Sequence, residues 1–258
     1  MKNKIIYISV ISGLAALACV LPASADQLAD IQSAGTLVVG LEGNWAPWSY
    51  HDEEDTLTGF DAEVTRAIAD KLGVEAEIVE GPWESLFAGL DAKRYDLVVN
   101  GVEITEERGE KYDFSEPYAY IHTVLIVRSD NEDITDFDDL EGKSTVNSLG
   151  STYMELAESY GATAAGVSTL DETLSNVLNG RADATLNANV SFYDYMSVHP
   201  EAELKIAALT EDASEVAIPI RKGEDAFKEA VDKAIQELKA DGTLKELSEK
   251  FFGEDITG

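Results

Sequence analysis

The chain has 258 residues, with 50 Asp and Glu against 19 Lys and Arg, so its formal net charge at pH 7 is −31. Such a charge argues against nucleic acid or anionic membrane surfaces as partners. The histidines, His51, His122 and His199, are widely separated, and no P-loop, dinucleotide fingerprint or zinc-protease motif is present. The sequence therefore predicts a protein that is not an enzyme and has no cofactor or metal site.

Residues 1–25 have the features of a secretory signal peptide. Two lysines precede an apolar stretch at 5–21, and Ala23-Ser24-Ala25 forms a typical cleavage site. We expect cleavage after Ala25 and a periplasmic or extracytoplasmic location. The alternative is a lipoprotein signal that uses Cys19, although residues 16–18 make a poor lipobox. Cleavage after Ala25 removes the only cysteine and two lysines but no acid, which takes the charge from −31 to −33.

From residue 36 onward, apolar strand patterns alternate with amphipathic helix patterns, which predicts a parallel α/β construction. Asp61 is expected to cap a helix that carries Val64, Ile68 and Leu72 on one face. The other elements expected in this unit are strands at 37–39, 76–79 and 96–100 and a short helix at 85–90.

An isolated arginine, Arg108, follows the strand predicted at 96–100. That loop opens at the carboxyl edge of the sheet, where open α/β folds bind their ligands. A planar guanidinium can bind a carboxylate through two parallel hydrogen bonds, which a lysine cannot do. The alternative is a surface ion pair with Glu106, Glu107 or Glu110.

The segment 121–128 is rich in β-branched residues, and a second α/β alternation follows it. We expect it to cross into a second lobe and residues 216–220 to cross back, so that two crossings form a hinge. Elements expected between the crossings are strands at 144–147 and 184–186 and helices at 151–160, 169–178 and 191–198. The predicted lobes are 26–123 with 216–258, the latter helical, and 124–215.

Several motifs resemble those of a known family. Thr105 and Arg108, followed by Asp-Phe-Ser-Glu-Pro-Tyr at 113–118, are similar to the first-lobe signature of extracytoplasmic solute-binding proteins of ABC importers for polar amino acids. The resemblance covers nearly all of the mature chain, through further motifs at 57–61, 83–90, 94–96, 180–184 and 242–244.

The resemblance implies an α/β fold of the type II periplasmic-binding-protein class. Each of its two lobes has a mixed sheet flanked by helices, and two strands form the hinge. The implied function is capture of an L-amino acid between the lobes and delivery to a membrane permease, by a monomer that binds no nucleic acid. Two alternatives use the same fold: an enzyme like cyclohexadienyl dehydratase, and an amino-acid sensor domain.

The resemblance assigns the ligand's carboxylate to Arg108 and to the backbone around Gly101 and Val102. In the second lobe it adds Ser151 and Thr152, which open the helix predicted at 151–160. Free amide groups at a helix start favour an anion, which agrees with that assignment. The alternative is an ordinary helix cap, and one residue can do both.

Two positions depart from the family. Ala188 stands where the family has an Asp that binds the ligand's ammonium, and Glu103 stands where it has Ser or Thr. We therefore hypothesise that Glu103 has taken over ammonium binding. The alternatives are that Glu103 pairs with Arg108 in the empty site, or that it binds a cationic side chain.

Trp45 and Trp83 are expected to form aromatic walls of the site, whereas Trp48 is expected in the core. Glu42 occupies a position that faces the ligand's side chain in some family members. The loop that starts at Asn100 and the run 183–187, which includes Asn187, look most like the cystine-binding branch. Cystine or another polar amino acid is therefore the expected ligand, with a cationic one left open by Glu42 and Glu103.

Overall fold

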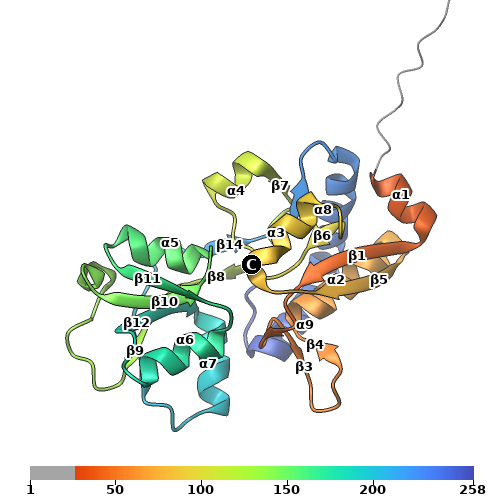
Figure 1. Ribbon diagram of the computed structural model, residues 1–258. Helices are drawn as coiled ribbons and strands as arrows, with labels where there is room; N and C mark the ends of the chain where they lie inside the picture. The colour runs from red at the N-terminus through yellow and green to blue at the C-terminus, as the bar shows by residue number, and fades with distance from the viewer. Residues whose placement is uncertain (1–26) are drawn as a thin grey trace, which may run out of the picture.

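The computed structural model describes residues 27–258. The predicted signal peptide, its cleavage site and Cys19 lie outside the described residues. Two lobes stand side by side and are joined by a pair of extended segments (Figure 1). The helices are α1 (Gln27–Ala34), α2 (Phe60–Leu72), α3 (Trp83–Asp91), α4 (Glu106–Lys111), α5 (Thr152–Ser159), α6 (Leu170–Leu178), α7 (Asn189–Val198), α8 (Asp225–Ala240) and α9 (Thr243–Phe252).

The first lobe is built on a parallel sheet in the order β5-β1-β6. Its strands are β1 (Thr36–Leu41), β5 (Glu75–Glu80) and β6 (Leu97–Val98). A small antiparallel sheet of β2 (Asn44–Trp45), β3 (Ser49–His51) and β4 (Leu57–Thr58) lies next to it and was not predicted. These strands are two or three residues long, too short for an alternating pattern.

Helix α2 buries Val64 and Ile68, as their spacing predicts. The expected cap at Asp61 is wrong, because Gly59 is the N-cap and Asp61 lies within the first turn. Its buried carboxylate instead accepts a hydrogen bond of 2.8 Å from the Tyr118 hydroxyl. Burial raises the Asp61 pKa to about 7. Helices α8 and α9 pack on α2 and complete the core of this lobe.

The second lobe has a mixed sheet in the order β11-β10-β12-β9-β13. β10 pairs parallel with β11 and β12, whereas β9 is antiparallel to β12 and β13. The strands are β9 (Thr123–Arg128), β10 (Ser144–Ser148), β11 (Thr163–Val167), β12 (Ala184–Ala188) and β13 (Leu204–Leu209). Strands β11 and β13 were not predicted; β11 reads TAAGV, a composition with little strand preference.

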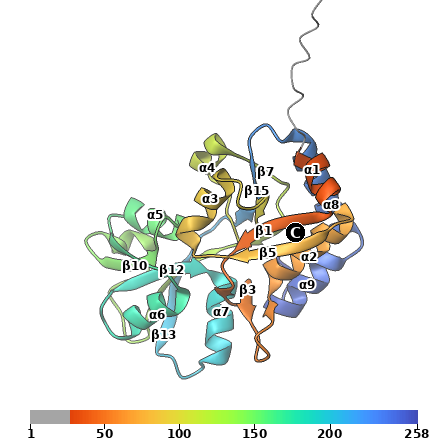
Figure 2. The same ribbon diagram turned by 45° about the vertical axis from the view of Figure 1, so that its right-hand side comes forward.

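Two antiparallel pairs mark the connections. β8 (Ala119–Ile121) pairs with β14 (Ser214–Val216), and β7 (Tyr112–Phe114) pairs with β15 (Pro219–Arg221). The β8 and β14 segments run between the lobes (Figure 1), and Figure 2 shows the two lobes turned by 45°. The two-lobed α/β fold is thus confirmed, while the exact residue boundaries between lobes stay a prediction. Within residues 27–258, no helix has the length and apolar character to cross a bilayer.

Candidate functional site

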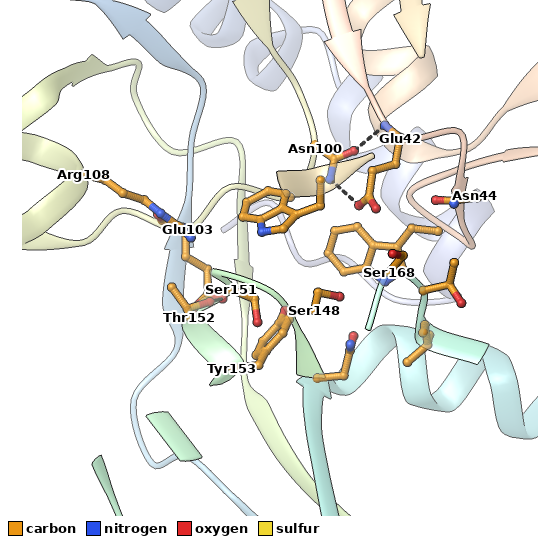
Figure 3. Close-up of a pocket in the computed structure, with 16 residues that line it drawn as sticks. Glu42, Asn44, Asn100, Glu103, Arg108, Ser148, Ser151, Thr152, Tyr153 and Ser168 are labelled. Carbon is orange, nitrogen blue, oxygen red and sulfur yellow. Dashed lines mark hydrogen bonds between the residues drawn. The ribbon is translucent and has the colours of Figure 1, made fainter. Parts of the chain in front are cut away.

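A cavity lies between the lobes, and loops and helix starts of both lobes line it (Figure 3). Its first-lobe wall consists of Glu42, Asn44, Trp45, Trp83, Asn100, Gly101, Glu103 and Arg108. Its second-lobe wall consists of Ser148, Ser151, Thr152, Tyr153, Ser168, Thr169, Leu170 and Asn187. The cavity volume is about 40 Å³, whereas one water needs roughly 10–15 Å³ by the same measure. This cavity therefore encloses little free space.

Of the residues predicted for the site, Val102 does not line the cavity. Its side chain is fully buried, and its carbonyl accepts a hydrogen bond of 2.9 Å from the Ala217 amide. Val102 therefore ties the loop to the strand that returns from the second lobe. The chain alternates sides here, which turns Gly101 and Glu103 toward the cavity and the Val102 side chain into the core. The expected contact between the ligand and the backbone around Val102 stays a prediction.

Arg108 lies on a short helix rather than the expected loop. The Thr105 hydroxyl caps α4 by accepting a hydrogen bond of 3.2 Å from the Arg108 amide. The guanidinium lies 5.3 Å from the centroid of the Trp83 ring and 5.5 Å from that of Phe87. Its Nη1 donates to the carbonyl oxygen of Glu103 at 2.9 Å. Backbone and aromatic contacts thus hold the guanidinium in place.

No carboxylate of residues 27–258 lies within ion-pair distance of Arg108, so the alternative of a surface ion pair is not formed. Glu107 pairs with Lys111 instead, at 2.9 Å. Burial lowers the Arg108 pKa, and the negative charges of Glu103 and Glu155 oppose that shift. An arginine remains charged under these conditions. The guanidinium therefore keeps donors free for an anion.

Glu103 is buried beside the hinge, where it forms an isolated bridge with Val216. Its carboxylate accepts a hydrogen bond of 2.6 Å from the Thr152 hydroxyl of the second lobe. The two side chains lie next to each other at one side of the cavity, beside Ser151, and connect the two lobes there (Figure 3). Glu103 is thus linked to Arg108 only through its carbonyl group, so the expected alternative of a side-chain pair with Arg108 is not formed.

The start of α5 supplies the second-lobe side of the site. Ser151 is the N-cap, and its hydroxyl accepts a hydrogen bond of 3.2 Å from the Met154 amide. Its own amide donates to the Ser148 carbonyl at 3.1 Å. The amides of Thr152 and Tyr153 in the first turn have no partner within the helix. These two donors can serve an anion in the cavity.

Tyr153 lines the cavity but was not predicted. Its side chain is 7% exposed, and its hydroxyl has no hydrogen-bond partner among residues 27–258. Burial raises the Tyr153 pKa well above its ordinary value, and the charge of Glu103 adds to the shift. The Ala188 amide lies near the hydroxyl and opposes the shift, but its hydrogen bond goes to the Asn187 side-chain oxygen. A buried hydroxyl without a hydrogen-bond partner lowers the stability of the folded protein, because its lost contact with water is not replaced. The sequence signal that could have found it is its place directly after the Ser-Thr pair of the helix start.

Glu42 and Asn100 form a paired unit on the first-lobe wall (Figure 3). The Asn100 amide nitrogen donates to the Glu42 carboxylate at 2.8 Å, and the Glu42 backbone amide donates to the Asn100 side-chain oxygen at 2.8 Å. Burial raises the Glu42 pKa to about 7, although the bond from Asn100 partly opposes this. Glu42 is therefore a carboxyl group that a nearby cation would ionise.

The aromatic residues play different roles. Trp45 is half-buried, lines the cavity and stacks on Trp48 with ring centroids 5.3 Å apart. Gly101 has φ +55°, and a Cβ there would lie 2.7 Å from the Trp45 ring, so only glycine fits. Trp48 is fully buried, as expected, and its Nε1 donates to the Ser191 hydroxyl of the second lobe at 3.0 Å.

The remaining unpredicted wall residues come mainly from a second helix start. Thr169 caps α6 by accepting a hydrogen bond of 3.2 Å from the Glu172 amide. Ser168 and Leu170 flank it, and all three line the cavity. The pattern Thr-x-x-Glu at 169–172 is a helix-start signal that could have placed them. Asn187, which was predicted, lies on the wall while its side-chain oxygen accepts from the Ala188 amide.

Comparisons with known proteins give a consistent family. The model of bacterial extracellular solute-binding proteins, family 3, matches residues 37–254. The L-cystine-binding protein TcyA of Bacillus subtilis is 39% identical over 90% of this chain and 87% of its own length. The L-cystine solute receptor of Neisseria gonorrhoeae, solved in an unliganded open conformation, is 41% identical with a TM-score of 0.61, over 90% of this chain and 98% of its own.

A ligand-bound structure superposes better despite lower identity. An ancestral arginine-binding protein bound to arginine is 34% identical and reaches a TM-score of 0.79, over 85% of this chain and 99% of its own. The lobes of the present chain are therefore arranged more like those of a ligand-bound protein than like those of the open one.

Proposed function

The chain belongs to family 3 of the bacterial extracellular solute-binding proteins, and from this premise we propose that it captures a polar L-amino acid between its lobes for the membrane permease of an ABC importer. The observation that carries the proposal is the unpaired guanidinium of Arg108, held against Trp83 on the cavity wall. A planar fork of donors in a partly buried cavity is suited to a carboxylate.

The ligand's carboxylate binds between the lobes. Arg108 supplies donors from the first lobe, and the amides of Thr152 and Tyr153 at the start of α5 supply donors from the second. The helix dipole at that end adds to the attraction. Because donors of both lobes converge on one anion, carboxylate binding stabilises the closed arrangement.

Glu103 takes the ligand's ammonium. Its buried carboxylate is linked to a neutral hydroxyl of Thr152 and, among residues 27–258, to no cation. An ammonium forms a stronger, charge-assisted hydrogen bond with a carboxylate than a hydroxyl does. The unpartnered hydroxyl of Tyr153 lies near enough to Glu103 to feel its charge and offers an acceptor to the same ammonium. The zwitterion is then matched although Ala188 replaces the family's usual acid.

Binding requires a hinge motion between lobes that comprise residues 26–123 with 216–258 and residues 124–215. In the closed arrangement the cavity has room for only a few waters, so the ligand must enter while the lobes are apart. The better superposition on the ligand-bound relative than on the open one supports two such arrangements. Small-angle scattering should show compaction on adding the cognate amino acid, and identical profiles with a tight ligand would contradict the hinge.

Cystine is the first ligand to test, because TcyA and the gonococcal receptor are named for it. The protein acts outside the cytoplasm as a monomer, after removal of residues 1–25. It performs no chemistry on its ligand. Thermal-shift screening against the common amino acids and cystine tests the binding function. Conversion of prephenate or arogenate by the purified protein would overturn it in favour of a dehydratase.

A further inference from the structure

A second and larger cavity adjoins the first one. Its volume is about 380 Å³, within the size range of ligand pockets. Asn44 and Leu170 line both cavities, so the two share a boundary formed by one residue from each lobe. Its remaining walls are the β2–β3 hairpin of the first lobe and helices α6 and α7 of the second. A ligand whose side chain passes Asn44 and Leu170 would therefore emerge into it.

The lining of the second cavity favours a cation. Two carboxylates, Asp171 and Asp194, line it, and no lysine or arginine does. The two histidines of the lining, His51 and His199, each lie beside an acid outside it, Glu80 and Glu201. The Asp194 carboxylate is half-buried and has no hydrogen bond or ion pair with any residue of 27–258. Burial raises the pKa of Asp194, since no neighbouring donor compensates for lost water. A bound cation would offset that cost.

An aromatic side chain of the first lobe, Tyr50, lines the second cavity together with Asp194 of the second lobe. Tyr50 of β3 lies near enough to Asp194 for the carboxylate's charge to add to the effect of burial in raising the Tyr50 pKa. Tyr195 of α7 lines the same space and lies over His199, with ring centroids 4.6 Å apart. Aromatic faces beside carboxylates bind the stem and head of an ammonium-bearing chain.

We propose that this second cavity is a subsite for the far end of a two-headed ligand: an amino acid whose long side chain carries a second ammonium, bound by Asp194 and Asp171. The inference rests on the proposed function, because the first head must be held by Arg108 and Glu103. Residues outside the first cavity then select the length of the ligand and the charge at its far end. The distal carboxylate of a ligand such as cystine would point to solvent.

Three disulfide ligands separate the two distal charges. L-Cystine has both, the mixed disulfide of cysteine with cysteamine keeps only the distal ammonium, and that with 3-mercaptopropionate keeps only the distal carboxylate. Residues 27–258 contain no thiol, so the protein cannot exchange with them. Calorimetric titration of the secreted protein should show at least about tenfold tighter binding of the cysteamine disulfide than of the mercaptopropionate disulfide, as expected for one charge-assisted hydrogen bond.

The variant Asp171→Asn/Asp194→Asn should reduce that ratio to about twofold or less while still binding all three ligands. The matched control is Asp133→Asn/Asp212→Asn, which removes two charges at exposed positions that line neither cavity and should keep the ratio. An unchanged ratio in the first variant overturns the subsite. A ratio lost in Glu42→Gln instead places the distal ammonium in the first cavity and also overturns it.

The outcomes distinguish failure of the subsite from failure of the proposed amino-acid binding. If the subsite alone is wrong, all three ligands still bind, and Arg108→Lys weakens them equally. If no amino acid or disulfide binds the unaltered protein, the proposed function fails as well. Equal affinity of the unaltered protein for the two mixed disulfides means that the second cavity holds only water.

Discussion

The two walls of the first cavity differ in charge. The first-lobe wall carries Arg108, Glu42 and Glu103, whereas the second-lobe wall offers only hydroxyls, one amide side chain, one leucine and the amides of a helix start. Charge-assisted hydrogen bonds are roughly twice as strong as neutral ones. The difference indicates that the first lobe can bind both charges of a zwitterion before closure. The second lobe then completes the shell with neutral groups.

Two hydrogen bonds that cross between the lobes agree with this difference between the walls. Thr152 to Glu103 and Trp48 to Ser191 are both hydrogen bonds between a neutral donor and an acceptor of the other lobe. The bond between Trp48 and Ser191 is neutral and contributes about 0.5–1.5 kcal/mol net, whereas the bond to the Glu103 carboxylate contributes about 1.5–3 kcal/mol. They can hold the lobes together without preventing them from opening. Affinity should therefore depend on the first wall more than on the second.

The largest expected effect is that of Arg108→Lys. Lysine keeps the charge but loses the two-pronged geometry and the flat contact with Trp83, so affinity for an amino acid should fall by about 100-fold or more. Calorimetric titration measures it. Arg181→Lys makes the same exchange at an exposed position away from the cavity and should change nothing. If Arg108→Lys lowers affinity less than threefold, affinity does not depend mainly on the charged groups of the first-lobe wall.

The next effect is that of Glu103→Gln, which keeps shape but removes the charge. Affinity for an amino acid should fall by about 10- to 100-fold, since one charge-assisted bond to the ammonium is lost. Affinity for the matching hydroxy acid, which has no ammonium, should not fall. Glu106→Gln on the same segment, exposed and outside the cavity, is the control. Wild-type amino-acid affinity in Glu103→Gln would remove Glu103 from ammonium binding.

A smaller effect on affinity is expected for the second-lobe wall, together with a gain in stability of the empty protein. Tyr153→Phe removes a buried hydroxyl that has no partner, so the free energy of unfolding of the empty protein should rise by about 1 kcal/mol. Affinity should fall by no more than about tenfold, because only a neutral hydrogen bond is lost. Chemical denaturation and titration measure the two changes. Tyr193→Phe, on an exposed side chain, should alter neither.

If Tyr153→Phe destabilises the empty protein, its hydroxyl has a structural partner and the argument for its role in binding fails. If Tyr153→Phe lowers affinity more than Glu103→Gln does, the second-lobe wall contributes more to affinity than the first-lobe wall.

The smallest effect is a pH dependence from Glu42, whose pKa is about 7 in the empty protein. A cationic side chain bound beside it favours the ionised carboxylate, so binding releases a proton and affinity rises with pH. Between pH 6 and pH 7 the rise should be about fivefold for a cationic ligand and absent for a neutral one. In Glu42→Gln the dependence should disappear. If it persists there, another group such as Asp61 is responsible.

Much of the fold follows from local patterns. The spacing of Val64 and Ile68 places the buried face of α2, and the β-branched run at 123–128 forms β9, which is antiparallel to both of its neighbours in the second sheet. The short strands β2, β3 and β4 escape such patterns because tertiary contacts, rather than periodicity, define them. The crossing expected as one strand at 121–128 is divided at His122, between β8 and β9.

The site was partly predictable for similar reasons. Arg108, Glu103 and the start of α5 carry sequence signals, whereas the burial of the Val102 side chain between two residues that line the cavity does not. The unpartnered hydroxyl of Tyr153 is a property of packing and has no signature in the sequence. The bond between Trp48 and Ser191 joins positions 143 residues apart, so it depends wholly on how the lobes close.

The most direct test of the account is a crystal structure of the protein with its amino acid bound. The claim that the first lobe binds both charges predicts that the α-carboxylate lies on the Arg108 guanidinium. It also predicts that the α-ammonium lies within hydrogen-bond distance of the Glu103 carboxylate, with Thr152 and Tyr153 contributing from the other side. An ammonium held by second-lobe groups alone, or a carboxylate away from Arg108, would contradict it.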